Sequence, residues 1–332
     1  ATMQQIAAMA GVSVTTVSHV LSGNRPVNAR TAERVRAIIN QYSYVPDSAA
    51  RRLKSGHSGL IGFIVPDLTI SYFSGVANGI ETGADLREYG VIVSSTSSLT
   101  SERRMRFLDL LRDATLDGIV YVPDAAAVDA QVLAIATQYP VVLADELLSG
   151  SSDLASVTCD NAAGGRAVGE HLASLGHRRA LIIGGPESLI ASPRRVAGVK
   201  EAFPQALVLT GTFTAEAGYR LVDEALSNGL EFTCVAAAND DQALGALRRL
   251  REEGLSVPGD CSVVGFDDIP VAAYAGLTTI RQPAVEIGRA AADLLIEKIR
   301  NPLDIPSPPP QILLDVELVV RETTGPVPVG RG

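Results

Sequence analysis

Polar side chains stand at the ends of several short β-branched runs, where they could bind a small molecule. These run ends read Pro66-Asp67, Asp145-Glu146, Gly184-Gly185-Pro186, Asn239-Asp240-Asp241 and Asp267-Asp268. In open α/β sheets, ligands bind beyond the carboxyl ends of the strands. Carboxylate and amide oxygens accept hydrogen bonds, so this set favours a neutral, hydroxyl-rich ligand over an anion. The alternative is that the Asp-Asp pairs cap helix N-termini, which fits Asp241 better than Asp267.

Aromatic side chains could supply flat surfaces for such a ligand. Tyr72, Phe73 and Phe213 could stack on a sugar or a purine ring. No motif typical of catalysis accompanies them, because the P-loop, the nucleophile elbow and the His-Glu-x-x-His pattern do not occur in the sequence. Gly184-Gly185 is only a weak match to a phosphate-binding loop. We therefore predict a binding protein and not an enzyme.

The histidines and cysteines do not form a metal site or a disulfide framework. The histidines have no cysteine or carboxylate at a metal-ligand spacing, and the cysteines lie far apart in the sequence. These residues are His19, His57, His171, His177, Cys159, Cys234 and Cys261. We expect no metal, no cofactor and no structural disulfide.

The charge of the chain is unevenly distributed. The net charge is −9, but residues 1–58 hold seven of the 28 Lys/Arg and two of the 37 Asp/Glu, which gives +5. The remaining 274 residues hold 21 and 35, which gives −14. A small basic segment on a large acidic body indicates a polyanion-binding module joined to a second function. Chance clustering is the alternative on charge alone.

The first 42 residues predict three short helices. Thr2 and Gln5 have the spacing of a capping box, Gly11 permits a sharp turn, and Ser13 and Asn28 can cap the helices that follow. The apolar spacing predicts the inner face of each helix. In the first helix this face is Ile6, Met9 and Ala10, and in the second, over Val14–Leu21, it is Val17, Val20 and Leu21. In the third, over Ala29–Tyr42, it is Ala32, Val35, Ile38 and Ile39.

This arrangement predicts a helix-turn-helix, although any small three-helix bundle is the alternative. In a helix-turn-helix, the outward N-terminal residues of the second helix meet base edges in the major groove. The Val14 side chain could contact a thymine methyl group, and the Thr15 and Thr16 hydroxyls could bond bases or phosphates.

The segment after this bundle joins a short apolar face to basic side chains. Ser48 can cap one or two helical turns that run through Lys54, with Ala49, Ala50 and Leu53 on one face. An apolar wedge beside Arg and Lys is the composition that minor-groove binding proteins insert between base steps. A flexible linker is the alternative, because an isolated helix this short is marginal in water.

From residue 59 onward, apolar runs alternate with helical patterns. The predicted strands are Leu60–Val65, Val91–Ser95, Gly118–Val122, Val141–Ala144, Ala180–Ile183, Leu207–Thr210, Cys234–Ala238 and Ser262–Phe266. Helical patterns include Phe73–Glu88, Ser101–Asp113, Ala162–Leu175, Ala215–Leu226, Ala243–Arg251 and Val285–Ile299. This alternation predicts parallel sheets covered by helices, and the length of the segment favours two lobes.

Residues 2–54 resemble the N-terminal module of the lactose/galactose-repressor (LacI-type) family of bacterial transcription regulators. The resemblance rests on Ile6-Ala-Ala-Met-Ala-Gly-Val-Ser-Val-Thr-Thr-Val-Ser-His-Val-Leu, Arg34-Val, Tyr44-Val-Pro and Ala50-Arg-Arg-Leu-Lys. It implies that Val14 and Thr15 help to select the operator and that Leu53 is a minor-groove wedge. One residue departs from the family pattern: His19 stands where members usually carry arginine. Histidine cannot make arginine's bidentate bond to guanine, so the usual base preference at that position is in doubt.

The resemblance extends through the body to about residue 324. The matching segments are Ile61-Gly-Phe-Ile-Val-Pro-Asp, Leu175-Gly-His-Arg, Arg195-Val-Ala-Gly, Asn239-Asp-Asp-Gln-Ala-Leu-Gly, Val263-Val-Gly-Phe-Asp-Asp and Leu277-Thr-Thr-Ile-Arg-Gln-Pro. They imply an N-terminal all-α helix-turn-helix domain followed by an α/β, two-lobed, periplasmic-binding-protein-like domain with parallel sheets. The chain would cross between lobes near 158–161, 281–284 and 312–314.

The expected domain boundaries and contacts follow from this reading. The domains are 1–45 for the helix-turn-helix, 46–58 for a hinge helix and linker, 59–324 for effector binding and dimerisation (lobe 1 at 59–158 and 284–312, lobe 2 at 159–281 and 313–324), and 325–332 for a tail. The expected DNA contacts are Thr2, Ser13, Val14, Thr15, Thr16, Ser18, His19, Asn24, Arg25, Arg51, Leu53 and Lys54. The expected effector contacts are Tyr72, Phe73, Asp145, Arg195, Phe213, Asn239, Asp267 and Gln282.

The sequence therefore predicts a ligand-responsive transcriptional repressor of sugar-utilisation genes. It would bind a palindromic operator in double-stranded DNA as a homodimer and be released by a small effector. The tail shows no heptads, so we expect no tetramer helix. A purine- or nucleoside-responsive co-repressor mode is the alternative, although the loop 187–193 is more apolar than in purine-binding relatives. A plain solute-binding protein is disfavoured by the basic segment and by the lack of an export signal, so we expect a cytoplasmic, nucleoid-associated protein and no membrane contact.

Overall fold

The chain forms two compact units, Ala1–Ser58 and Gly59–Gly332. The computed structural model describes residues 1–22, 25–42, 57–96, 106–124, 127–303 and 306–327. Among the described helices, none combines the length and apolar character that a bilayer span requires. Each unit is built around its own hydrophobic core.

The first unit contains three helices, as the sequence predicts: α1 (Met3–Ala10), α2 (Val14–Ser22) and α3 (Ala29–Gln41). Ile6, Val17 and Val35 are fully buried where the helices meet. Two residues predicted on inner faces, Met9 and Leu21, are instead 42% and 37% exposed. A bundle this small buries only a narrow stripe of each helix, and Ala7 and Ala10 complete the stripe of α1.

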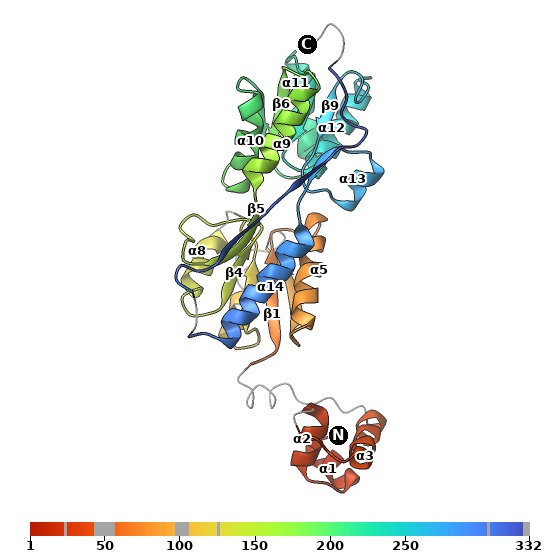
Figure 1. Ribbon diagram of the computed structural model, residues 1–332, viewed down its shortest axis with the longest axis vertical. Helices are drawn as coiled ribbons and strands as arrows, with labels where there is room; N and C mark the ends of the chain where they lie inside the picture. The colour runs from red at the N-terminus through yellow and green to blue at the C-terminus, as the bar shows by residue number, and fades with distance from the viewer. Residues whose placement is uncertain (23–24, 43–56, 97–105, 125–126, 304–305, 328–332) are drawn as a thin grey trace. The chain divides into compact units, whose positions relative to one another are not determined.

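The second unit contains two parallel sheets, as predicted (Figure 1). The first sheet has the strand order β11 (Gln311–Leu314), β5 (Ala155–Cys159), β4 (Val141–Ala144), β3 (Gly118–Tyr121), β1 (Leu60–Val65) and β2 (Gly90–Ser95). The second has the order β7 (Leu207–Thr210), β6 (Ala180–Gly184), β8 (Cys234–Ala237) and β9 (Ser262–Val264). A short antiparallel pair, β10 (Thr279–Arg281) with β12 (Glu317–Val319), lies outside both sheets.

Helices accompany each sheet and define two lobes. Lobe 1 contains α5 (Tyr72–Asp85), α7 (Arg106–Arg112), α8 (Ala127–Ile135) and α14 (Ala284–Arg300). Lobe 2 contains α9 (Asn161–Ser174), α10 (Ala191–Ala202), α11 (Ala215–Ser227), α12 (Asp240–Glu252) and α13 (Pro270–Tyr274). Figure 1 shows α5 and α14 side by side in lobe 1 and α9 beside α10 in lobe 2.

The chain passes between the lobes three times. The first two connections join β5 to α9 and β10 to α14, near the positions expected from the sequence. The third differs from the expected 312–314, because β11 stays paired with β5 as far as Leu314, opposite Cys159. The crossing therefore occurs at Asp315 and Val316, just before β12 begins.

Close helix pairs in both lobes meet through glycines. A Cβ atom added to Gly245 of α12 would lie 1.9 Å from the carbonyl oxygen of Ala215 in α11, and one on Gly218 of α11 would lie 2.0 Å from the carbonyl oxygen of Gln242. Glycines of α5 and α14 make the same kind of reciprocal contact in lobe 1. The absence of side chains lets these helix backbones touch.

Gly245→Ala is expected to lower the free energy of unfolding by about 1–3 kcal/mol, because α11 and α12 must separate to admit the methyl group. This loss exceeds the gain of about 1 kcal/mol in helix propensity that alanine brings. Urea unfolding followed by circular dichroism measures the change. Arg251→Ala, at an exposed position of the same helix, is the control and should leave the midpoint nearly unchanged. An unaltered midpoint in Gly245→Ala would show that α11 and α12 can separate without a loss of stability.

His177 is buried in lobe 2 and makes the unit sensitive to pH. Its side chain is fully buried, and its ring nitrogens lie 2.9 Å from Thr233 Oγ1 and 3.0 Å from Ser262 Oγ. Burial lowers the pKa of His177. The unfolded chain therefore binds this proton more readily than the folded chain does, so stability is lost as the pH falls below the unfolded value of about 6.5.

We expect His177→Gln to gain stability relative to the wild type as the pH falls from 8 towards 5, because only the wild type loses the His177 contribution. Buried carboxylates with raised pKa values, such as Asp240, act in the opposite direction in both proteins and cancel in this comparison. Urea titrations at several pH values measure both slopes. His171 retains part of the dependence in the variant, because burial lowers its pKa as well. Identical slopes in the two proteins would rule His177 out as the titrating group.

Candidate functional site

Helix α2 presents a small polar surface at its N-terminus. Ser13 Oγ accepts the Thr16 N–H at 3.1 Å, so Ser13 caps α2 as predicted, and the two hydroxyls lie 2.9 Å apart. Val14 and Thr15 are exposed and point outward from this cap, whereas Ser18 and His19 are half-buried. The exposed residues at the start of the helix match the surface with which a helix-turn-helix reads a major groove.

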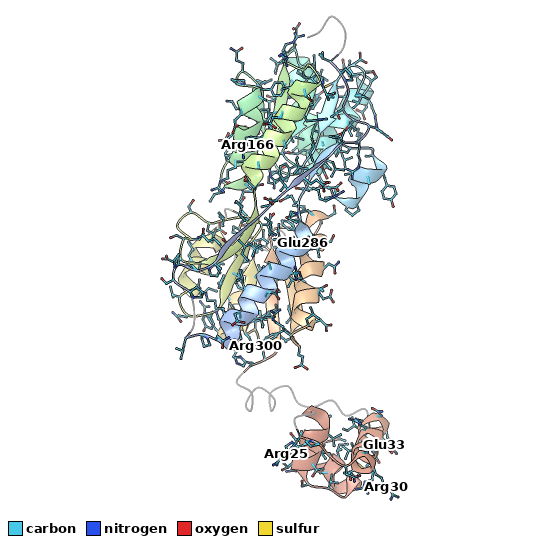
Figure 2. All side chains as sticks on the ribbon, in the orientation of Figure 1. Arg25, Arg30, Glu33, Arg166, Glu286 and Arg300 are labelled. Carbon is cyan, nitrogen blue, oxygen red and sulfur yellow. The ribbon has the colours of Figure 1, made fainter. Side chains whose placement is uncertain are left out.

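The first unit also exposes basic side chains. Arg25 and Arg30 are exposed, and Figure 2 labels both together with Glu33. Thr2 is exposed, and its hydroxyl accepts the Gln5 N–H, which completes the predicted capping box of α1. Four other predicted DNA contacts lie outside the described residues: Asn24, Arg51, Leu53 and Lys54.

A second group of predicted residues forms a hydrogen-bonded network between the lobes. Tyr72, at the start of α5, donates its hydroxyl to Asp145 Oδ1 at 2.8 Å and lies 3.4 Å from Gln282 Oε1. Gln282, on the connection between β10 and α14, donates Nε2 to Asp267 Oδ1 at 2.6 Å. Asp145 follows β4 of lobe 1 and Asp267 follows β9 of lobe 2, so the network spans the cleft.

Arg195 adds a buried cation to the lobe 2 side of this network. Its Nη1 lies 3.5 Å from Asp267 Oδ1, and its Nε donates to Asn161 Oδ1 at 2.7 Å. The guanidinium carbon lies 3.9 Å from the centroid of the Phe266 ring, a cation–π distance. Only 7% of Arg195 is exposed, so the guanidinium is held rigidly by partners on several sides.

The two carboxylates of the network are withdrawn from solvent, Asp267 fully and Asp145 partly. Burial raises the pKa of Asp145 and raises that of Asp267 well above the usual carboxyl range, while the nearby Arg195 guanidinium acts in the opposite direction on both. A ligand that donates hydroxyl groups to these carboxylates would stabilise their charged form. The site is therefore suited to hydrogen-bond donors that carry no charge.

The loop that carries Asp267 has a strained backbone, and hydrogen bonds to Asp240 hold it in place. Asp267 has φ 121° and Asp268 has φ 56°, both in a region that side chains other than glycine rarely adopt. Asp240, at the start of α12, accepts the Ile269 N–H at 2.9 Å and the Thr279 hydroxyl at 2.5 Å. Such strain persists only where the surrounding structure fixes it, and Asp240 supplies that constraint.

The remaining predicted contacts lie beside the network and not in it. Asn239 caps α12 by accepting the Gln242 N–H at 2.9 Å, and its Nδ2 donates to the Phe213 carbonyl oxygen at 3.3 Å. The cap of α12 is therefore Asn239, and the alternative reading of Asp241 as a helix cap is wrong. The Phe73 ring is buried edge-to-face against Tyr72, with centroids 5.5 Å apart.

A groove of about 520 Å³ opens beside the network. Tyr72, Asp267 and Gln282 line it, as does Glu286 at the start of α14, labelled in Figure 2. The other predicted effector contacts do not line this groove. The polar groups between the lobes are therefore bonded mainly to one another in this structure.

Several residues of the site were not predicted from the sequence. Asn161 and Phe266 hold Arg195, and the Cys159 thiol donates to Gln282 Oε1 at 2.8 Å. Burial raises the pKa of Cys159 to about 12, so this thiol remains protonated and acts as a donor. Prediction of the strand β5 would have indicated two of these residues, because Cys159 ends β5 and Asn161 follows it. Among the described residues, no group of three or more His, Cys, Asp or Glu is placed to hold a metal ion.

Comparison with known proteins agrees with both halves of this description. Residues 2–47 match the model of bacterial regulatory proteins of the lacI family, and residues 169–324 match that of a periplasmic binding protein-like domain. The HTH-type transcriptional repressor PurR of Vibrio atlanticus (strain LGP32) is 31% identical over 312 residues, which cover 91% of this chain and 92% of that protein. The chain belongs to the lacI family. The resemblance seen in the sequence is thereby confirmed.

Solved structures of lacI-family regulators have the same fold. The lac repressor dimer bound to operator and the anti-inducer ONPF matches with a TM-score of 0.84 and 30% identity, covering 98% of this chain and 99% of that one. The complex of the transcriptional regulator CelR with cellobiose matches with a TM-score of 0.74 and 28% identity, covering 97% and 99%. This lacI-family chain is accordingly a ligand-responsive, DNA-binding transcriptional regulator with a helix-turn-helix domain and a two-lobed domain.

Proposed function

We propose that this lacI-family regulator is a repressor that senses a neutral sugar. The network of Tyr72, Asp145, Arg195, Asp267 and Gln282 between the lobes carries this proposal. Its acidic and amide oxygens accept hydrogen bonds, whereas its one buried cation is already paired with Asp267. An uncharged ligand with several hydroxyl groups can take over these bonds without leaving a buried charge unpaired.

The repressor acts on DNA as a homodimer. One recognition helix reads about half of a site, so a two-fold symmetric pair of chains reads a palindrome whose halves lie about one helical turn apart. The lac repressor relative is described as a dimer bound to operator, which supports the same assembly here. Because its operator lies in the nucleoid, we place the regulator in the cytoplasm.

Effector binding changes operator affinity through a shift between lobe arrangements. A ligand bonded to both Asp145 and Asp267 favours the arrangement in which these carboxylates face each other. The ligand shifts the balance between the two lobe arrangements only as far as it binds one of them more tightly than the other. Residues 46–58 are predicted from the sequence to pass this change to the DNA. Release from the operator is the direction we expect for a sugar effector.

A thermal-shift screen tests the effector class. The panel contains D-glucose, D-ribose and cellobiose against adenosine, guanosine and hypoxanthine, followed by operator gel shifts with each hit. A ligand at 100 times its Kd adds about 2.7 kcal/mol of stability, which is a clear shift in Tm. We expect a neutral sugar to stabilise the protein and release the operator.

A purine or nucleoside co-repressor is the second candidate. It is favoured by the ring of Tyr72, which lines the groove beside the network and could stack on a purine. Stabilisation by a nucleoside alone, with tighter operator binding, would replace the sugar proposal with this one.

His19→Arg is expected to change base preference at one symmetric pair of operator positions. Arginine can make two parallel bonds to guanine O6 and N7, worth about 1–3 kcal/mol of discrimination, and histidine cannot. Selection of binding sites from a randomised duplex pool measures the consensus of both proteins. Arg36→Lys is the control, because Arg36 is exposed on α3 and is not among the expected DNA contacts, so the consensus should stay as it was. An identical consensus for His19→Arg would place this side chain away from the bases.

A further inference from the structure

The N-terminus of helix α10 is capped from the opposite lobe. The residue before the helix, Ile190, provides no side-chain cap, so the first-turn N–H groups need another acceptor. Glu146, which follows β4 in lobe 1, supplies it: its two carboxylate oxygens lie 3.2 and 3.1 Å from the Ala191 nitrogen of lobe 2. Glu146 is only 5% exposed, so this contact is shielded from solvent.

The cap joins the two halves of the proposed effector site. Glu146 directly follows Asp145 in the chain, so both side chains are carried by the same turn of lobe 1. Ala191 precedes Arg195 by four residues, which places both on one face of α10. The distance from the lobe 1 carboxylate to the lobe 2 guanidinium therefore depends on where the first turn of α10 is held.

The opposite side of α10 cannot move to compensate. A Cβ atom on Gly165 of α9 would lie 2.2 Å from the Arg195 carbonyl oxygen, and one on Gly198 of α10 would lie 2.4 Å from the Ala162 carbonyl oxygen. These backbone contacts fix α10 against α9. A contact from lobe 1 to the first turn of α10 therefore positions α10 and α9 together relative to lobe 1.

The charges around Glu146 suit this role. Its carboxylate faces the positive end of the α10 dipole and also accepts the Leu147 N–H at 2.9 Å. Burial and the neighbouring Asp145 carboxylate raise the pKa of Glu146, whereas the two backbone N–H donors and the Arg195 guanidinium act in the opposite direction and favour the charged form. A charge-assisted bond to a helix N-terminus is stronger than a neutral one, and burial preserves that strength.

We propose that Glu146 is a positioning residue of the effector site: by capping α10 from across the cleft, it sets Arg195 against Asp145. This inference rests on the proposed function, because it assumes that these two side chains bind the effector. Glu146 does not itself contact the ligand in this scheme. Its contribution is to hold the site in one geometry before the ligand arrives.

Hydrogen exchange in the ligand-free, full-length protein tests the cap directly. In Glu146→Ala, we expect the Ala191 amide at the start of α10 to exchange about tenfold faster, because its buried acceptor is lost. Glu146→Gln keeps an acceptor and should restore most of the protection. The first turn of α12, capped by Asn239 within its own lobe, should not change in either variant. Glu187→Ala, an exposed acid shortly before α10, is the control for charge.

Titration with the panel sugar that stabilises the wild type then tests the positioning role. We expect the Kd to rise about tenfold or more in Glu146→Ala and to recover in Glu146→Gln, with ligand-free operator affinity unchanged. Unchanged exchange at α10 overturns the proposal, as does faster exchange with an unchanged sugar Kd. If no panel sugar binds the wild type, the sugar proposal fails, and the exchange result alone decides whether Glu146 caps α10.

Discussion

Asp267→Ala is expected to abolish the effector response while leaving operator binding by the ligand-free protein intact. Asp267 accepts from Gln282 at 2.6 Å and is the carboxylate paired with Arg195. A hydrogen bond from a ligand hydroxyl to a charged acceptor contributes about 1.5–3 kcal/mol. Loss of the Asp267 carboxylate should therefore lower the effector affinity by about 10- to 150-fold.

Arg195→Ala should produce the same loss of effector response, because it removes the other partner of the Asp267–Arg195 ion pair. It also removes the stacking on Phe266 and the bond from Arg195 to Asn161. Arg194→Ala, at the exposed neighbouring position, is the matched control and should respond as the wild type does. Asp267→Asn retains an acceptor for Gln282 but not the charge, so it separates hydrogen bonding from charge pairing.

Operator gel shifts with and without the panel sugars measure both expectations. The decisive readout is the ratio of operator affinity with and without ligand, which should fall to one in Asp267→Ala. Release at the wild-type ligand concentration would mean that Asp267 does not contact the effector. Loss of operator binding without ligand would mean that the residue supports the fold instead.

Most of the strands that the sequence predicts are buried on both faces, and the exceptions are the two edge strands β2 and β7. Leu60–Val65 and Val141–Ala144 are continuous apolar runs, and the structure has β1 and β4 at the same bounds. Parallel strands covered by helices need such runs, so composition alone locates them. The strand β5 escaped prediction because Ser156 and Thr158 interrupt its apolar pattern, although both side chains are buried.

The strands of the third crossing could not be predicted for a different reason. β11 alternates exposed and half-buried residues over four positions, and β12 has three residues with little burial. Such short segments carry no periodicity that distinguishes them from a loop. They become strands because the crossing places them beside β5 and β10, which is a tertiary effect.

Residues of the site differ in how much the sequence reveals about them. Asp145 and Asp267 follow predicted strands, so their location at the strand ends marks them as ligand contacts. Arg195 lies within a helix and Gln282 on a connection, and only the family resemblance indicated them. Asn161 holds Arg195 through a contact between two helices, for which no local sequence pattern exists.

Leu53→Ala is expected to weaken binding to the specific operator by about 1–3 kcal/mol, roughly a factor of 5 to 150. Leu53 lies outside the described residues, and the expectation comes from the sequence, in which Leu53 stands between Arg52 and Lys54. A wedge between base steps stabilises bent DNA, and bending costs energy that depends on the sequence being bent. The loss should therefore fall on the operator, whereas binding to a random duplex should change little.

Lys54→Ala provides the contrasting result. A lysine that neutralises a phosphate contributes equally on every sequence, so its removal should weaken operator and random DNA alike and reduce the slope of log affinity against log salt by about one. Fluorescence anisotropy with both duplexes at several salt concentrations separates the two effects. An equal loss on both duplexes in Leu53→Ala would remove the wedge from the mechanism. A selective loss on the operator would mean that this apolar side chain contributes to sequence recognition through DNA shape and not through charge.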